Sequence, residues 1–338
     1  MNITILACEG KETTGLVTYS RNVTKELLKM NDRIKMIPIS SLEFKVGERL
    51  VGGYIFSGLK FAKIFAKKID GDIVHSLDLQ VIHPKTNIVT LHDLTALYRS
   101  KLEKYLYKFL LTRLGHMKKI ITPTNYIADN VAKITGVNRE KFITVYYGLN
   151  HKMFYPSNKT PEEIAQDKYN LVHVGEVRER KNIHLILEAI TALGEGYRFI
   201  HIGPDRELNY KEKCLEIARK NDIDFINIGY LSQEKIKDYY THADLFVFPS
   251  KDEGFGLPPL EAMACGTTSV VSNIPVFREI YKNSVYYSEL NPNELADKIE
   301  YAVKHKKPKN ELISYAKKFT WEKAAENLLK IYEEASEK

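Results

Sequence analysis

Short apolar runs recur along this chain, separated by longer stretches in which apolar residues return at helical spacing. The pattern predicts six strands in the first half, near residues 2–8, 34–39, 73–76, 87–91, 119–122 and 142–147. It predicts six more in the second half, near 170–174, 198–202, 224–228, 244–248, 268–272 and 285–287. Strands that alternate with helices indicate parallel βα units, so we expect each half to form its own doubly wound sheet of the α/β class.

Two stretches without periodicity suggest boundaries. Residues 150–161 are rich in turn formers, and we place a domain boundary there, with a first domain of 1–153 and a second of 154–319. The other is the basic, proline-broken stretch Lys304–Asn310. Beyond it, Thr320 is a predicted N-cap for a closing amphipathic helix, within about 320–338. Its predicted apolar stripe consists of Trp321, Ala324, Ala325, Leu328, Leu329 and Tyr332.

Composition describes a soluble globular protein of 338 residues, with 44% hydrophobic and 28% charged residues and no apolar run long enough for a membrane span. Three cysteines without metal-ligand spacing favour a reducing cytoplasm. The net charge of +7 suits phosphorylated substrates or anionic membrane surfaces and does not indicate nucleic acid binding. The basic amphipathic segment 59–69 is either a packed helix or a peripheral contact with the inner membrane face.

The most informative segment runs from Pro249 to Gly266 and reads Pro-Ser-Lys-Asp-Glu-Gly-Phe-Gly-Leu-Pro-Pro-Leu-Glu-Ala-Met-Ala-Cys-Gly. It follows the predicted strand 244–248 and carries a glycine on each side of Phe255, where backbone can approach a ligand closely. A proline pair then starts a helix, with Glu253 on the loop and Glu261 expected in the first helical turn. Both carboxylates are expected at the carboxyl end of a parallel strand, the usual ligand position in such sheets.

The paired glutamates have two interpretations. A carboxylate near a helix start can simply complement the helix dipole. Two glutamates around a glycine-rich turn also suit a polyol phosphate, because backbone amides bind the anion and carboxylates accept hydrogen bonds from hydroxyls.

This segment resembles the Glu-x7-Glu signature of the family 4 retaining glycosyltransferases, the glycosyl transferases group 1, whose fold is GT-B. The resemblance covers almost the whole chain, including the Phe-Thr-Trp entry to the closing helix. It implies two Rossmann-like domains facing a central cleft, with the closing helix crossing back to the N-terminal domain. It also implies that Glu253 holds donor-sugar hydroxyls, that Glu261 holds the nucleotide ribose, and that backbone at Phe255, Gly256 and Leu257 meets the sugar and phosphate.

The loop 175–182 follows the first strand of the second domain and ends in Arg180, Lys181 and Asn182. Two cations before a helix are either a solvated turn or a clamp for a diphosphate, and the resemblance favours the clamp. Many relatives carry Arg directly after the glycine, where this chain has Glu176. We expect its carboxylate to point away and Arg178 or Arg180 to take the missing role.

Three weaker candidates lie elsewhere. His92, beside Asp93 at a strand end, resembles the family histidine that touches the donor sugar, although a structural role is an alternative. Gly15 precedes a helix and is either a phosphate contact or a plain turn glycine. Tyr230 and Leu231 follow a strand of the second domain, where backbone is expected to meet the nucleotide base. In contrast, Asp70-Gly-Asp72 is interpreted as a turn and not as a metal motif.

We therefore expect a metal-independent hexosyltransferase, of mannosyl or glucosyl type, that acts with retention. Its partners would be a nucleotide-diphosphate sugar, GDP- or UDP-linked, and a glycan, lipid-linked or small-molecule acceptor, with no further cofactor. Two alternatives remain: a sugar-nucleotide 2-epimerase of related fold, and a non-catalytic sugar-nucleotide-binding subunit of a transferase complex.

Overall fold

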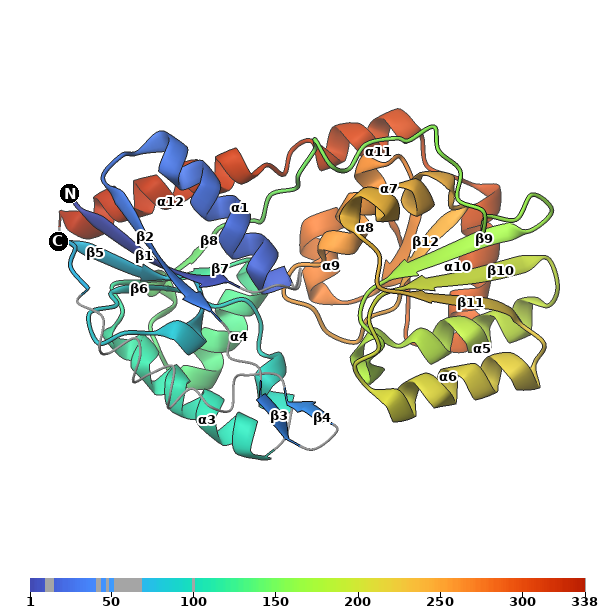
Figure 1. Cartoon of the computed structure of the whole chain (residues 1–338), viewed down its shortest axis with the longest axis horizontal. Coiled ribbons are helices and arrows are strands. Elements are labelled where there is room, and N and C mark those ends of the chain that lie inside the picture. The colour runs from blue at the N-terminus through green and yellow to red at the C-terminus, as the bar shows by residue number, and fades with distance from the viewer. Residues whose placement is uncertain (10–14, 41–43, 47–48, 52–68, 99–100, 338) are drawn as a thin grey trace. The chain divides into compact units, whose positions relative to one another are not determined.

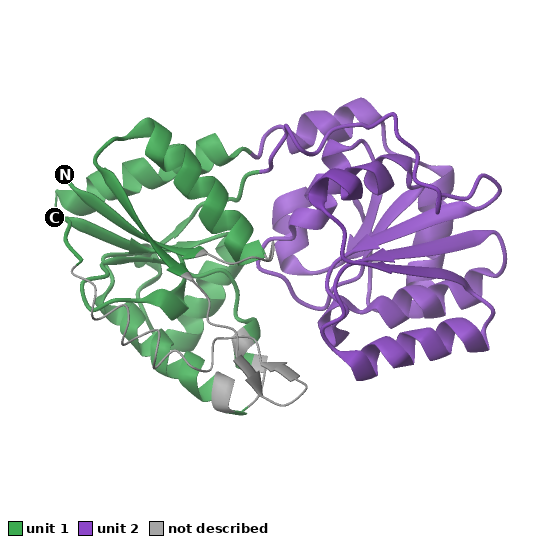
Figure 2. Ribbon diagram, in the orientation of Figure 1, with its two compact units in different colours: residues 1–148, 320–338 green, residues 149–319 purple. Residues whose placement is uncertain are grey.

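A computed structural model describes residues 1–9, 15–40, 44–46, 49–51, 69–98 and 101–337 of the chain. The chain divides into two compact units, one of residues 1–148 with 320–338 and one of residues 149–319 (Figure 2). We predicted the boundary at 153/154, and it falls five residues earlier. Residues 149–153 belong to the second unit because Leu149 donates its N–H to the Phe319 carbonyl (3.2 Å) and the His151 ring contacts the same oxygen (3.0 Å).

The first unit is built on a six-stranded parallel sheet (Figure 1). Its strands, in spatial order, are β2 (Ile34–Ser40), β1 (Ile3–Glu9), β5 (Ile73–Ser76), β6 (Ile88–Thr90), β7 (Lys119–Thr122) and β8 (Phe142–Thr144). Figure 1 shows α1 (Gly15–Met30) and α12 (Trp321–Ser336) over one face, with α3 (Lys101–Leu111) and α4 (Asn125–Thr135) over the other. A short antiparallel pair, β3 (Phe44–Val46) and β4 (Arg49–Val51), was not predicted.

The second unit has a parallel sheet with the strand order β11-β10-β9-β12-β13-β14. These strands are β9 (Tyr169–Val174), β10 (Tyr197–Ile202), β11 (Asp224–Gly229), β12 (Leu245–Phe248), β13 (Ser269–Ser272) and β14 (Tyr286–Ser288). In sequence order this is 3-2-1-4-5-6, the dinucleotide-binding arrangement. The sheet is buried on both faces, as the four fully buried residues of β12 illustrate.

Seven helices are described in the second unit. On one face, α5 (Ile183–Leu193), α6 (Leu208–Lys220) and α10 (Pro292–Lys304) share a hydrophobic core with the sheet. The other four are α7 (Gln233–His242), α8 (Leu257–Ala264), α9 (Pro275–Tyr281) and α11 (Lys309–Ala316). Prolines occupy the first turn of α8 and Gly266 follows it with a φ of +85°, so the predicted start and end of this helix are both confirmed.

The C-terminal helix α12 belongs to the first unit, as the predicted fold required. Thr320 caps it by accepting a hydrogen bond from the Lys323 N–H (3.2 Å). Its buried face contains the predicted residues except Leu329, which is only partly buried, and it adds Ile331 and Ala335. The helix packs along α1, and the Tyr332 hydroxyl lies 2.6 Å from Nδ1 of the buried His75.

The segments that pass between the units contact each other. Gly148, just before the boundary, lies against the start of α12, where an added Cβ would be 2.1 Å from the Trp321 nitrogen. The position therefore has no room for a side chain.

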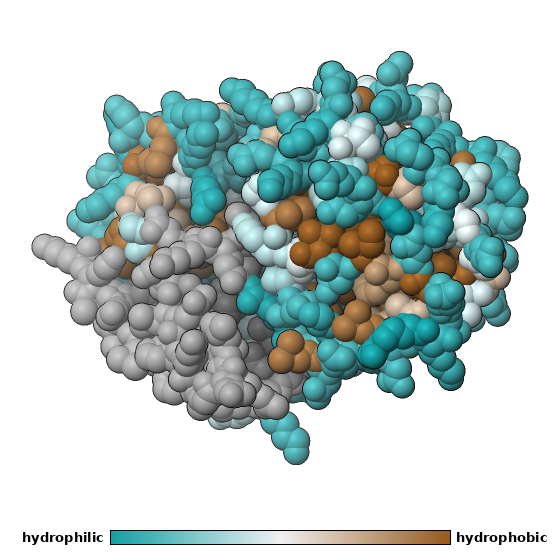
Figure 3. Space-filling view, turned by 45° about the vertical axis from the view of Figure 1, so that its right-hand side comes forward, coloured by the Kyte–Doolittle hydropathy of each residue, from teal (hydrophilic) through white to brown (hydrophobic). Residues whose placement is uncertain are grey.

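Outside the residues drawn in grey, hydrophilic side chains cover most of the face in Figure 3, with apolar residues in smaller patches between them. Among the residues that the structure describes, no helix combines the length and apolarity that a membrane crossing needs. The predicted basic helix at 59–69 lies, apart from Ile69, outside the described residues.

Candidate functional site

The strand order of the second sheet reverses between β9 and β12. Open α/β sheets bind ligands at such a switch point, outside the carboxyl ends of the strands, because the connections leave the sheet in opposite directions there. Two of the segments predicted from sequence meet here. The loop 175–182 follows β9, and the loop 249–256 follows β12.

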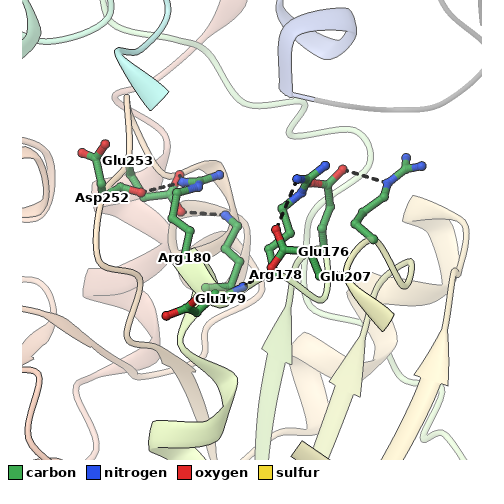
Figure 4. Close-up of polar contacts among 9 residues, drawn as sticks. Glu176, Arg178, Glu179, Arg180, Glu207, Asp252 and Glu253 are labelled. Carbon is green, nitrogen blue, oxygen red and sulfur yellow. Dashed lines mark hydrogen bonds and ion pairs between the residues drawn. The ribbon is translucent and has the colours of Figure 1, made fainter. Parts of the chain in front are cut away.

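Lys181 and Glu253 join these two loops. Lys181 Nζ donates to Glu253 Oε1 at 2.6 Å, and Arg180 NH1 lies 3.0 Å from Glu253 Oε2. Arg180 also donates to the Asp252 carbonyl oxygen at 2.5 Å, and Figure 4 shows its head directed at the Asp252–Glu253 turn. One carboxylate therefore holds both predicted clamp cations at the switch point.

This ion pair is almost fully enclosed, since Lys181 and Glu253 each expose 8% of their surface. Burial alone would raise the pKa of Glu253, but Arg180 and Lys181 outweigh it and hold that pKa at about 2. Burial lowers the pKa of Lys181, and the Glu253 carboxylate opposes that shift. The Lys181 ammonium also lies 4.8 Å from the centre of the Phe248 ring, which favours the cation. Each charge thus depends on the other for its ionised state.

Glu261 lies in a different environment. We expected it in the first turn of the helix, but it is the fifth residue of α8 and lies just past that turn, because the helix starts at Leu257. Its Oε2 accepts a hydrogen bond from the Tyr240 hydroxyl at 2.8 Å. Burial raises the pKa of this carboxyl to about 7. The two signature glutamates therefore have opposite electrostatic character, one firmly ionised and one near its titration point at neutral pH.

The turn between the glutamates is shaped by Gly256, which has a φ of +89°. A Cβ there would lie 2.6 Å from the Phe277 ring and 2.8 Å from the Tyr281 hydroxyl, so only glycine fits. Phe255 is buried and packs edge-on against Phe319, with ring centres 6.0 Å apart. The Phe255 side chain thus anchors the turn.

A second charged cluster lies beside the first (Figure 4). We expected Glu176 to point away from the site, and instead it accepts from Arg178 Nε at 2.7 Å and from Arg206 Nε at 3.2 Å. Glu207 Oε1 is 3.6 Å from Arg178 NH1. Sequence reasoning missed Arg206. Its signal was a cation in a Gly-Pro-Asp-Arg turn, placed directly after a predicted strand of the nucleotide-type domain.

At the edge of this group, β11 ends at Gly229, whose carbonyl accepts from the Gly203 N–H at 2.8 Å. Tyr230 follows with 62% of its surface exposed, and Leu231 is partly exposed. The predicted base-binding residues are therefore accessible at the same edge of the sheet.

In the first unit, both ring nitrogens of His92 are engaged. Nε2 lies 2.7 Å from the Leu77 carbonyl oxygen, and Nδ1 contacts the Tyr147 hydroxyl. A carbonyl only accepts, so Nε2 carries the proton and Nδ1 accepts from Tyr147. The Tyr147 ring in turn stacks on Trp321 of α12, with centres 6.1 Å apart. The His92 ring is thus held between Leu77 and Tyr147, two residues that the sequence analysis did not single out.

The remaining candidates of this unit are simpler. Asp93 Oδ1 accepts from the Thr95 N–H at 2.9 Å, at the start of the short 3-10 helix Thr95–Tyr98. Gly15 is the first residue of α1 and is exposed, and residues 10–14 before it lie outside the described part. Asp72 Oδ2 accepts from the Asn2 N–H at 2.8 Å, and Asp70 Oδ1 accepts from the Gly71 N–H at 3.1 Å. These two carboxylates stabilise a turn at the amino end of β5, in line with their interpretation.

Two parallel six-stranded sheets with flanking helices are the fold of the GT-B class. Residues 155–319 match the family model of the glycosyl transferases group 1, so the second unit belongs to that family. The resemblance to the glycosyl transferases group 1 and the α/β fold, both predicted from the sequence, are thereby confirmed.

Individual proteins agree with this assignment. An O-antigen chain mannosyltransferase of Salmonella typhimurium is 29% identical over 215 residues, which cover 62% of this chain and 58% of that protein. An uncharacterised glycosyltransferase of Methanocaldococcus jannaschii is 25% identical over 311 residues and 83% of each chain. The sucrose-phosphate synthase structure from Thermosynechococcus elongatus superposes with a TM-score of 0.79 and 17% identity, over 98% of both chains. That structural likeness establishes the fold.

Proposed function

We propose that this chain is a retaining, metal-independent glycosyltransferase that moves a hexosyl unit from a nucleotide-diphosphate sugar to a glycan, lipid-linked or small-molecule acceptor. The observation that carries the proposal is the pairing of Arg180 and Lys181 on one buried carboxylate at the switch point of a dinucleotide-type sheet. The mannosyltransferase relative supports a mannosyl or related hexosyl unit.

In this proposal Arg180 and Lys181 bind the diphosphate of the donor. When the bond between the anomeric carbon and the phosphate oxygen breaks, the diphosphate leaves with the electron pair and gains negative charge. Cations held in advance stabilise that charge without reorganising, which lowers the barrier. The acceptor oxygen bonds to the same carbon from the same face, and its proton passes to the departing phosphate oxygen. No covalent enzyme intermediate is needed.

Glu253 has two tasks in this arrangement. It keeps Lys181 protonated in a buried place, and its remaining lone pairs accept hydrogen bonds from sugar hydroxyls. Glu261 accepts from the ribose hydroxyls, and backbone at Gly256 and Leu257 meets the sugar. The roles of Gly15 and His92 toward the donor, and of Tyr230 and Leu231 toward the base, remain predictions. A cytoplasmic location with peripheral membrane contact likewise stays a proposal.

The direct test presents UDP- and GDP-linked glucose and mannose to the protein, with and without glycan and lipid-linked acceptors. We expect one donor to raise the melting temperature and to lose its sugar to an acceptor with the anomeric configuration retained. If a donor incubated alone is converted to its 2-epimer, the chain is an epimerase instead. Donor binding without transfer to any acceptor would indicate a binding subunit.

A further inference from the structure

The loops after β9 and β10 are locked together by their backbones. Gly175 donates its N–H to the Ile202 carbonyl at 2.9 Å, and Val177 donates to the Pro204 carbonyl at 2.9 Å. Gly203 leaves no gap at this contact, since a Cβ there would lie 1.8 Å from the Gly175 carbonyl oxygen. The loop that carries Arg206 therefore has a fixed place beside the loop of the diphosphate clamp.

One carboxylate holds an arginine from each loop. Glu176 meets both guanidinium groups through Nε, Arg178 at 2.7 Å and Arg206 at 3.2 Å. All three side chains keep between 23% and 33% of their surface accessible to solvent. A guanidinium has five N–H donors, and its outer edge matches two oxygens of a phosphate. The two guanidinium groups thus neutralise the Glu176 carboxylate, which would otherwise repel an anion.

The order of the strands determines where Arg206 and Arg178 lie relative to the proposed positions of the nucleotide base and the sugar. Along the carboxyl edge of the sheet, the loop with Tyr230 follows β11, Arg206 follows β10, Arg178 follows β9 and Glu253 follows β12. Neighbouring strands lie about 4.8 Å apart, so these four ends span about 14 Å. A donor with its base at Tyr230 and its sugar at Glu253 has its phosphates in between, beside Arg206 and Arg178.

We propose that Arg206, together with Arg178, binds the diphosphate of the nucleotide-sugar donor, and that Glu176 is the positioning residue for both. This inference rests on the proposed function and adds a residue to that same site. Glu207 also lies 3.6 Å from Arg178, so two arginines and two glutamates balance in charge, and the cluster would hold an anion through the N–H donors of its guanidinium groups. The clamp thereby extends from Lys181 across β9 to β10.

The test measures binding of UDP and GDP by titration calorimetry, with inorganic pyrophosphate as a competitor, at several salt concentrations. The variants are Arg206→Ala, Arg206→Gln and Glu176→Gln, with Lys181→Ala as a comparator. Arg219→Ala is the matched control, since Arg219 lies on the exposed side of α6 with its nearest carboxylate oxygen at 4.0 Å.

We expect Arg206→Ala to weaken nucleoside diphosphate binding about 10-fold, the usual effect of losing one hydrogen bond to a charged group. Uridine and guanosine should bind unchanged, and the salt dependence of diphosphate binding should decrease. Arg206→Gln, which retains a donor toward Glu176, should show the same loss without any loss of folding stability. Glu176→Gln, which keeps an acceptor but removes the negative charge, should bind the diphosphate at least as tightly as the wild type.

Wild-type affinity in both Arg206 variants, with a clear loss in Lys181→Ala, would overturn this inference and leave the proposed function standing. A wild-type protein that binds neither UDP nor GDP would overturn the proposed function and this inference with it.

Discussion

Lys181 Nζ and Glu253 Oε1 lie 2.6 Å apart although 72 residues separate them in sequence. This contact ties the loop after β9 to the loop after β12 at the switch point. It makes the stability of the second unit and its proposed chemistry depend on the same pair.

Removing Lys181 and removing Glu253 should lower the stability of the protein by different amounts. In Lys181→Ala, Glu253 keeps Arg180 at 3.0 Å, whereas Glu253→Ala leaves both cations without their shared carboxylate. Breaking a buried pair so that a charge stays uncompensated typically costs about 3–5 kcal/mol. We expect Glu253→Ala to approach that loss in the free energy of urea unfolding, and Lys181→Ala to lose less stability but about 10²–10³ in turnover. Wild-type turnover in both variants would contradict the site assignment.

Glu261 predicts a pH dependence in nucleotide binding. Burial raises the pKa of this carboxyl to about 7, above the ordinary value of 4.5. The folded protein therefore holds a proton that the unfolded chain releases, so stability should fall as pH rises from about 4.5 to 7. Nucleotide affinity should rise over the upper part of that range, because an ionised carboxylate accepts hydrogen bonds from ribose hydroxyls more strongly than a protonated carboxyl does. Titrations between pH 5.5 and 8.5 test this, and Glu261→Gln should bind with a nearly flat pH profile.

The hydrogen bond from Tyr147 should influence which ring nitrogen of His92 carries the proton. We expect ¹⁵N–¹H correlation spectra of the wild type to show the Nε2–H tautomer of His92, since Leu77 accepts that proton. Tyr147→Phe removes the donor to Nδ1 and should cost about 1 kcal/mol of stability. It should also shift the His92 nitrogen resonances. Tyr105→Phe is the control, because Tyr105 is 71% exposed. Unchanged His92 spectra in Tyr147→Phe would rule out the hydrogen bond.

The contact between Gly148 and α12 predicts a steric effect. In Gly148→Ala the new methyl group would overlap the backbone nitrogen of Trp321, which lies 2.1 Å from the Cβ position. Overpacking of this kind costs about 1–3 kcal/mol, and the start of α12 has to move to relieve it. Thermal unfolding measures the loss, with Gly115→Ala as the control because nothing lies within 4 Å of its Cβ position. Equal melting temperatures for the two variants would show that Gly148 and the start of α12 can move apart at little energetic cost.

Metal independence is the fifth prediction. With Arg180 and Lys181 neutralising the departing diphosphate, transfer should continue in excess EDTA. The measurement is product formation before and after chelation. Activity that EDTA abolishes and Mn²⁺ or Mg²⁺ specifically restores would refute the cationic clamp as the main source of stabilisation.

The sequence by itself determined the elements and much of their chemistry. Each of the twelve predicted strands has a counterpart in the structure, because apolar periodicity and turn residues act locally. The same local rules explain the helix start at the proline pair of α8 and the Thr320 cap of α12. The antiparallel pair β3 and β4 was missed because two three-residue strands are too short to carry a period.

Only the tertiary structure decided which charges meet. That Lys181 reaches Glu253, that Arg206 reaches Glu176 and that Tyr147 reaches His92 depends on the order of strands in each sheet and on the return of α12. The sequence placed Glu261 in the first turn of its helix, whereas α8 begins one residue before the proline pair, so Glu261 lies just past that turn, beside Tyr240. The physical reason is the same in each case. A hydrogen bond or ion pair requires atoms within about 3 Å of each other. For residues far apart in the chain, packing sets that distance, and the local pattern around each residue does not encode it.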